Sequence, residues 1–259
     1  MSQPAAGSRT DREDDPAGGS RRTRLVRRVL DAAARRGGPV EKEILGLSDV
    51  VGRGGVCLDV GAEFGLYSHV LADVVGEDGA VHAFEPQRGA RRWLTLGVRA
   101  AGASWVHVHD MALGADPGHA LLSVPRRRGL AVHGRAFVTT GARDEGANRE
   151  FTAARSESVQ LSTVDEQVTA LGLHRLDLIK VDVEGAESAV LDGAGHTLAT
   201  HRPALLLEIE DRHSEKYGVG AADILRRLQD AGYVAHVWAD RWNAVDSLVP
   251  HERNYLFRS

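Results

Sequence analysis

The chain has 259 residues, 42% of them hydrophobic and 26% charged, and a formal net charge of −4. This is the composition of an ordinary globular protein, and its acidic balance disfavours nucleic acid as the main partner. No apolar run approaches the roughly 20 residues that span a bilayer, and a single cysteine, Cys57, excludes an intramolecular disulfide. We therefore expect a cytoplasmic protein whose partner is a small molecule, and neither nucleic acid nor a membrane. The oligomeric state is not readable from the sequence.

The first part of the chain differs from the rest. Residues 1–20 are small, polar and rich in Gly, Pro and Asp, so we expect them to be disordered. Residues 21–36 combine many arginines with aliphatic residues at helical spacing, which predicts a basic amphipathic helix packed on the edge of the domain. Contact of this helix with a membrane surface or an acidic partner is the alternative. A helical segment over 21–53 thus precedes a main domain over 54–259.

Short apolar strands alternate with helical segments from residue 54 onward. The expected strands cover residues 55–60, 80–85, 104–110, 176–183, 204–210, 233–238 and 254–258. A turn and helix over 61–75 and helices over 87–101 and 221–231 lie between them. Continuous apolar strands separated by helices are typical of a parallel sheet covered on both faces. With right-handed crossovers, this predicts a doubly wound α/β fold around a mostly parallel, seven-stranded sheet.

Residues 125–157 interrupt this rhythm. They are polar, carry several glycines and arginines, and lie between the third and fourth expected strands. A connection of this length inside a compact domain is usually functional or disordered. A lid over the substrate and a plain variable insertion are both open interpretations.

A glycine-containing turn follows the first strand, where doubly wound folds bind ligands. The sequence DVGAEFG places Asp59, Gly61, Ala62, Glu63 and Gly65 there. This D-x-G-x-x-x-G spacing differs from the G-x-G-x-x-G that holds a pyrophosphate, which counts against a nicotinamide oxidoreductase. A looser loop suits S-adenosylmethionine (SAM), because SAM has no phosphate. Asp59 is placed to accept hydrogen bonds from the ammonium group of such a ligand.

Two further strand ends supply candidate cofactor residues. Glu85 lies about 20 residues beyond the glycine turn, where an acid can accept hydrogen bonds from both ribose hydroxyls, and Pro86 suits the turn that follows. After the third strand, Asp110 is a candidate acceptor for an adenine amino group, and Met111 and Ala112 offer an apolar edge. Ordinary turns without a ligand are the alternative at both places.

Acidic residues end the fourth and fifth strands. Asp182 and Glu184 follow Lys180, and Glu208 and Glu210 follow the next apolar run. Such groups are costly at the end of an apolar strand unless they are used or paired. We expect Asp182 to touch the cofactor and to orient the acceptor. A structural ion pair with Lys180 is one alternative, and binding of Mg²⁺ by the carboxylates, Asp182 and Glu208 above all, is another.

His213 is the histidine best placed to act as a general base, because it follows the fifth strand end. An alcohol is a weak nucleophile at neutral pH and gains from a positioned base. We hypothesise that Asp182 orients the acceptor and that His213 or Glu208 takes its proton. A surface histidine without a role is the alternative.

Five stretches resemble, in their order and approximate spacing, the FkbM-type family of SAM-dependent methyltransferases. They are LDVGAEFGLYS, VHAFEP, MALGADPG, TVDEQV with LDLIKVDVEGAESAVLDGA, and RPALLLEIE. The resemblance implies a Rossmann-like class I methyltransferase fold with a final antiparallel strand, with Asp59, Gly61, Gly65 and Glu85 at the cofactor. The family commonly has Asn where this chain has Glu63, which adds a negative charge beside the cofactor.

The resemblance also implies a reaction. It is transfer of the SAM methyl group to a hydroxyl oxygen, often of a sugar or a polyketide-like natural product. N-methylation and SAM binding without catalysis stay open as alternatives.

Overall fold

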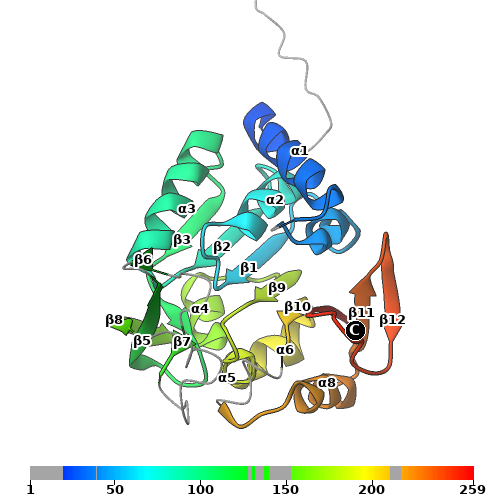
Figure 1. The fold of residues 1–259 in the computed structure, drawn as a ribbon. Helices are drawn as coiled ribbons and strands as arrows, with labels where there is room; N and C mark the ends of the chain where they lie inside the picture. Colours follow the sequence, from blue (N-terminus) through cyan, green and yellow to red (C-terminus); the bar gives the residue numbers. More distant parts are fainter. Residues whose placement is uncertain (1–19, 39, 128–129, 132–136, 140–152, 211–216) are drawn as a thin grey trace, which may run out of the picture.

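The computed structural model describes residues 20–38, 40–127, 130–131, 137–139, 153–210 and 217–259. The disorder expected over 1–20 therefore lies, Ser20 apart, outside the described residues. The main sheet has eight strands in the order β12-β11-β13-β10-β9-β1-β2-β3 (Figure 1). Their bounds are β1 Val56–Val60, β2 Ala80–Phe84, β3 Val106–His109, β9 Leu178–Val181, β10 Ala204–Glu208, β11 Val234–Trp238, β12 Trp242–Val245 and β13 Asn254–Arg258.

The sheet is mostly parallel, as predicted. The five strands from β3 through β2, β1 and β9 to β10 are parallel, and β13 runs antiparallel between β10 and β11. The expected count of seven strands was wrong by one. The eighth strand, β12, returns antiparallel along β11 after a tight turn in which Asp240 has φ 61°. Its half-exposed residues carry neither the apolar run nor the strict alternation that marks a strand.

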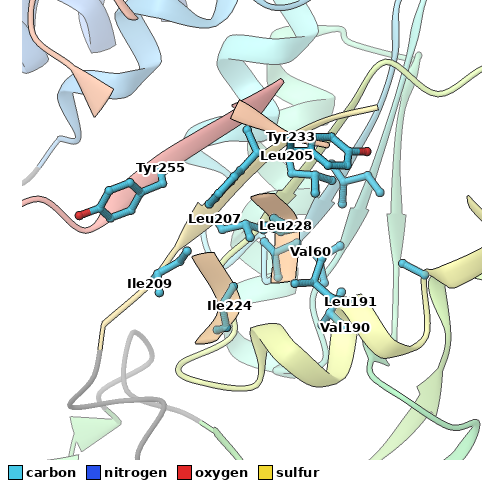
Figure 2. Packing of buried hydrophobic residues seen from close by; sticks show 14 of the residues in the cluster. Val60, Val190, Leu191, Leu205, Leu207, Ile209, Ile224, Leu228, Tyr233 and Tyr255 are labelled. Carbon is cyan, nitrogen blue, oxygen red and sulfur yellow. The ribbon is translucent and has the colours of Figure 1, made fainter. Parts of the chain in front are cut away.

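Helices cover both faces of this sheet. One face carries α1 Arg21–Arg35, the 3₁₀ helix η1 Lys42–Asp49, α2 Leu66–Val75 and α3 Arg88–Ala101. The other carries α4 Val164–Ala170, α5 Glu187–Asp192, α6 Gly195–His201 and α8 Ala221–Asp230. Strand residues alternate between the two cores, so that Cys57 faces the first and Leu58 and Val60 face the second. Figure 2 shows part of the second core, with Val60 of β1 near Val190 and Leu191 of α5. The double cover explains why most residues of the central parallel strands are apolar.

The connection from β3 to β9 folds as a second sheet in the order β4-β8-β5-β6, with β7 paired to β5. The bounds are β4 Ala112–Leu113, β5 Gly118–Arg127, β6 Leu130–Ala131, β7 Phe137–Val138 and β8 Ala153–Ser162. Alternate residues Ala120, Leu122 and Val124 of β5 are buried and pack with Val159 of β8. The described part of the 125–157 segment thus belongs to this second sheet, in which β5 begins before the segment and β8 ends after it.

The basic segment forms helix α1, as its spacing predicts, and packs on α2. The Thr23 hydroxyl donates to Asp73 at 3.2 Å, and Arg27 lies 3.5 Å from the same carboxylate. The outer face leaves Leu25 and Val29 more than half exposed. Within the part of the chain that the structure describes, no helix is long and apolar enough to cross a membrane.

His82, on β2, makes the stability of the fold depend on pH. Its ring is buried, its Nδ1 lies 3.2 Å from Nε2 of His109, and it stacks on His107 and His109. Burial lowers the pKa of His82 to about 4, and the two neighbouring histidines add to the shift. The unfolded chain, with a histidine pKa of about 6.5, therefore binds more protons between these values, and stability falls as the pH drops through this window.

We expect His82→Phe, which keeps a stacked ring, to remove roughly 2 kcal/mol of the stability lost between pH 7.5 and 4.5. Urea unfolding at both pH values measures this loss. His174→Asn, at an exposed histidine, is the control and should leave the loss as it is in the parent chain. An unchanged loss in His82→Phe would contradict this role.

Candidate active site

A cavity opens at the carboxyl ends of β1, β2, β9 and β10, the edge at which doubly wound sheets bind ligands. Its lining includes eight residues that the sequence singled out: Gly61, Glu63, Glu85, Pro86, Ala112, Asp182, Glu184 and Glu208. The other predicted cofactor residues, Asp59, Ala62, Gly65, Asp110 and Met111, are not among the lining residues. Strand ends far apart in the sequence therefore converge on one cavity.

The loop after β1 brings its backbone to this cavity. Gly61 has φ 79°, and a Cβ there would overlap the carbonyl oxygen of Asp182. Gly65, at the start of α2, has φ 90°, and a Cβ there would overlap the Leu94 side chain of α3. Glu63, between them, has φ 48°, a region that asparagine tolerates better than most residues. The chain thus departs from the family's usual Asn at a position where the backbone itself favours Asn.

Asp59 lies beneath this loop and is fully buried. Its Oδ2 accepts a hydrogen bond from the Ser68 hydroxyl at 2.6 Å, whereas Oδ1 has no partner among the described residues. Burial raises the pKa of this carboxyl, and the nearby Lys180 opposes the rise. A buried acceptor without a donor is costly, but Asp59 is not among the lining residues, so its contact with the ammonium group of a ligand such as SAM stays a prediction.

Glu85 ties two cavity loops together. Its Oε2 accepts from the backbone N–H of Glu63 at 2.8 Å, and its Oε1 accepts from that of Gln87 at 2.6 Å. Burial raises the pKa of Glu85 to about 7, although both hydrogen bonds oppose the rise. Each oxygen can accept a further hydrogen bond, and Glu85 lines the cavity, which fits the paired hydroxyls of a ribose.

The predicted adenine contacts are only partly at the cavity. Asp110 is 70% exposed in its side chain and forms an ion pair with Arg91 at 2.6 Å. That pair occupies the carboxylate that the sequence assigned to an adenine amino group. Of the apolar edge predicted for Met111 and Ala112, Ala112 lines the cavity, and Leu113 lines it where Met111 does not.

A charged cluster of Lys180, Asp182, Glu208 and Arg253 spans the ends of β9, β10 and β13. The Lys180 ammonium, almost fully buried, donates to Asp182 Oδ2 at 2.9 Å. Glu208, on the neighbouring strand, is hydrogen-bonded to Asp182, and Arg253 lies 3.4 Å from Glu208. The Lys180 ion pair is therefore present, and Asp182 of that pair also lines the cavity.

Burial and neighbouring charges shift the pKa values of the groups in this cluster. Burial raises the pKa of Glu208 to about 10, and the charge and hydrogen bond of Asp182 add to the rise. Burial alone would lower the pKa of Lys180, but Asp182 and Asp59 outweigh it and hold that pKa above its usual value. Near neutral pH the lysine is charged, and Glu208 holds a proton that its hydrogen bond shares with Asp182. The cavity thus presents an acceptor and a donor side by side.

Two other predictions concern the base and a metal. His213 lies outside the described residues. Within those residues, no group of three or more His, Cys, Asp or Glu side chains is arranged to hold a metal ion. Asp182 is engaged by Lys180, and Glu210 by Arg253 at 3.0 Å, so protein cations compensate these charges. The prediction of Mg²⁺ is therefore not supported.

Several lining residues escaped the sequence reasoning. Glu41 comes from the segment before the main domain, Arg253 from the loop before β13, and Leu122, Phe137 and Val138 from the second sheet. Alternation along β5 was the signal for that sheet, because an antiparallel strand buries every second residue. No local pattern marks Glu41 or Arg253, since they reach the cavity only through the tertiary fold.

The sheet order with antiparallel β13 between β10 and β11, and the cavity at the ends of β1, β2 and β9, are those of the Rossmann-like class I methyltransferase fold. The chain belongs to the family described as the Methyltransferase FkbM domain, whose model matches residues 59–235. This match confirms the family that the sequence motifs resemble.

The chain is also similar to several individual proteins. A solved FkbM methyltransferase from Methylobacillus flagellatus is 19% identical, with 78% of this chain and 43% of that one covered and a TM-score of 0.48. A SAM-dependent methyltransferase from Aquifex aeolicus is 15% identical, with 90% and 96% covered and a TM-score of 0.44. The antimetabolite synthetase AmbE of Pseudomonas aeruginosa is 28% identical over 201 residues, 67% of this chain. This chain spans 9% of that synthetase.

Proposed function

We propose that the protein transfers the methyl group of SAM to a hydroxyl oxygen of a small molecule, a sugar or a polyketide-like natural product. The observation that carries this proposal is the hydrogen-bonded pair of carboxyls, Asp182 and Glu208, in the cavity lining, with the Lys180 ammonium 2.9 Å from Asp182. The similarity to an antimetabolite synthetase supports a role in making natural products. A cytoplasmic location and a small-molecule partner are part of the same proposal.

In this proposal the cavity residues bind SAM and orient its methyl group toward the acceptor. SAM supplies a methyl group made electrophilic by its sulfonium, so the protein must mainly position two molecules. Asp59 holds the ammonium group, Glu85 the ribose, and Gly61 lets the backbone approach closely. Displacement then requires the acceptor oxygen in line with the S–CH₃ bond.

The charged cluster accounts for the proton. As the acceptor oxygen forms its bond to the methyl carbon, the S–CH₃ bond breaks and the hydroxyl proton must leave. Asp182, ionised beside Lys180, is the carboxylate able to take that proton. Glu208, already protonated, donates a hydrogen bond to the acceptor or to Asp182. This reverses the roles hypothesised from the sequence for these two residues, and His213 stays a prediction.

Calorimetric titration with S-adenosylhomocysteine (SAH) and separately with NAD⁺ tests the cofactor. We expect micromolar binding of SAH and none of NAD⁺; the opposite result would overturn the proposal. Methyl transfer from labelled SAM to panels of sugars, hydroxylated polyketides and amines then tests the acceptor. Labelling of hydroxyl compounds supports O-methylation, whereas labelling of amines alone would replace it by N-methylation.

A further inference from the structure

A chain of contacts leads from the segment before the family domain to the charged cluster. Glu41, which lines the cavity, accepts a hydrogen bond from the Tyr67 hydroxyl. The Tyr67 ring lies under the Lys180 ammonium, 4.7 Å from it, and that ammonium donates to Asp182 at 2.9 Å. Glu41 lies outside residues 59–235, which match the family.

The charge of the Lys180 ammonium is stabilised by the groups around it. It is almost fully buried, so it has lost most of the water that would hold its charge. The face of the Tyr67 ring attracts it on one side, and the carboxylates of Asp182 and Asp59 attract it on others. Without the Tyr67 ring, we expect the long Lys180 side chain to turn away from Asp182. The Asp182 carboxylate would then lose its cation and take up a proton more readily.

Tyr67 is well placed to fix that geometry. It lies in the first turn of α2, directly after the cofactor loop, and only 4% of it is exposed. Its ring is held from the far end by Glu41, which precedes η1. The pair therefore connects the N-terminal segment, the cofactor loop and β9 at a single point.

We propose that Glu41 and Tyr67 are positioning residues for methyl transfer, which hold the Lys180 ammonium against Asp182 and keep that carboxylate ionised beside the cofactor's sulfonium. The proposal rests on the proposed function, because it takes the cavity to bind SAM. It assigns a role to a residue that no family motif contains.

The charge of Asp182 can be followed without knowing the acceptor. SAM carries a positive sulfonium where SAH has a neutral thioether, so the ratio of their affinities reports the charge beside that sulfur. The ratio Kd(SAH)/Kd(SAM) should rise with pH as the carboxyls near that sulfur ionise, Glu85 and Glu187 with pKa values of about 7 among them, and a variant that weakens the hold of Lys180 on Asp182 should shift that rise. The groups that act on Asp182 are Asp59, Glu63, Tyr67, Lys180, Glu187 and Glu208. Glu41 acts on Lys180 and Glu208 in turn, and among all these groups only Tyr67 and Glu41 differ between the variants compared below.

The experiment is calorimetry of the full chain with SAM and with SAH between pH 5 and 9. In Tyr67→Leu the rise of the ratio should move up by about one pH unit, the size of one desolvated cation–π contact. In Tyr67→Phe, which keeps the ring, it should stay where it is in the parent. Tyr233→Leu is the matched control, because Tyr233 is also buried and lies under Arg202, 4.5 Å away.

Glu41 is tested by a pair of variants, which also serves if Tyr67→Leu does not fold. Glu41→Gln and Glu41→Leu both remove the charge, but only glutamine still accepts from Tyr67. The rise in Glu41→Leu should therefore lie at higher pH than in Glu41→Gln. An unchanged ratio in Tyr67→Leu, or equal curves for the Glu41 pair, would overturn the positioning role. Failure of the parent to bind either ligand would instead overturn the proposed function.

Discussion

Gly61→Ala is expected to abolish cofactor binding, with SAH affinity at least about 100-fold weaker and the free energy of unfolding lower by about 2–4 kcal/mol. Two costs combine at this position. Alanine disfavours φ 79°, and its Cβ would overlap the carbonyl oxygen of Asp182. Relief of that overlap must separate the β1 loop from the end of β9. This is the junction that places the cofactor loop beside the charged cluster.

Gly172→Ala separates these two costs. Gly172 has φ 62°, so it shares the backbone strain, but nothing lies within 4 Å of the position of its Cβ. We expect this variant to be less stable by only about 1 kcal/mol and to bind SAH as tightly as the parent chain does. Urea unfolding and calorimetry of both variants give the comparison. Parent-like SAH affinity in Gly61→Ala would show that the close approach to β9 is not needed for binding.

Much of the fold was predictable because its signals are local. The central parallel strands are buried on both faces, so they are largely apolar, and polar residues such as Glu85, Asp182 and Glu208 lie at or directly after their carboxyl ends. The parallel topology then places these ends at one edge, so that the convergence of Asp59, Glu85, Asp182 and Glu208 follows from order alone. The extra strand β12 and the second sheet lack such runs, and their pairing is set by tertiary contacts.

The protonation states and ion pairs of the site were harder to predict from the sequence. Sequence shows that Lys180 and Asp182 lie on one side of the strand, but not that burial leaves Glu208 protonated. An adenine contact was predicted for Asp110 because this residue follows a strand. In the structure Asp110 instead forms an ion pair with Arg91 of the preceding helix, α3. The contribution of Glu41 depends on how an N-terminal segment folds back over α2. Pairings between distant segments therefore decided which predicted residues face the cavity.

Asp182→Asn is expected to slow methyl transfer by about 10²–10⁴-fold while SAH affinity changes only a few-fold. Asparagine keeps the shape of the side chain but cannot take a proton, and it leaves the Lys180 ammonium without its nearest carboxylate. Single-turnover transfer to an acceptor found in the panel, with calorimetry for SAH, separates the two effects. Asp110→Asn, at an exposed acid outside the lining, should transfer at the parent rate. Equal rates for Asp182→Asn and the parent would remove Asp182 from the chemistry.

Glu208→Gln decides which carboxyl of the pair takes the proton. Because burial and Asp182 keep Glu208 protonated, glutamine imitates its neutral form, and the variant should retain most of the parent's rate. An asymmetry between Asp182→Asn and Glu208→Gln therefore assigns the proton to Asp182. The reverse asymmetry would mean that Lys180 holds Asp182 as an orienting group and that Glu208 ionises when the acceptor binds. In that case the assignment made from the sequence, with Asp182 as the orienting residue, would stand.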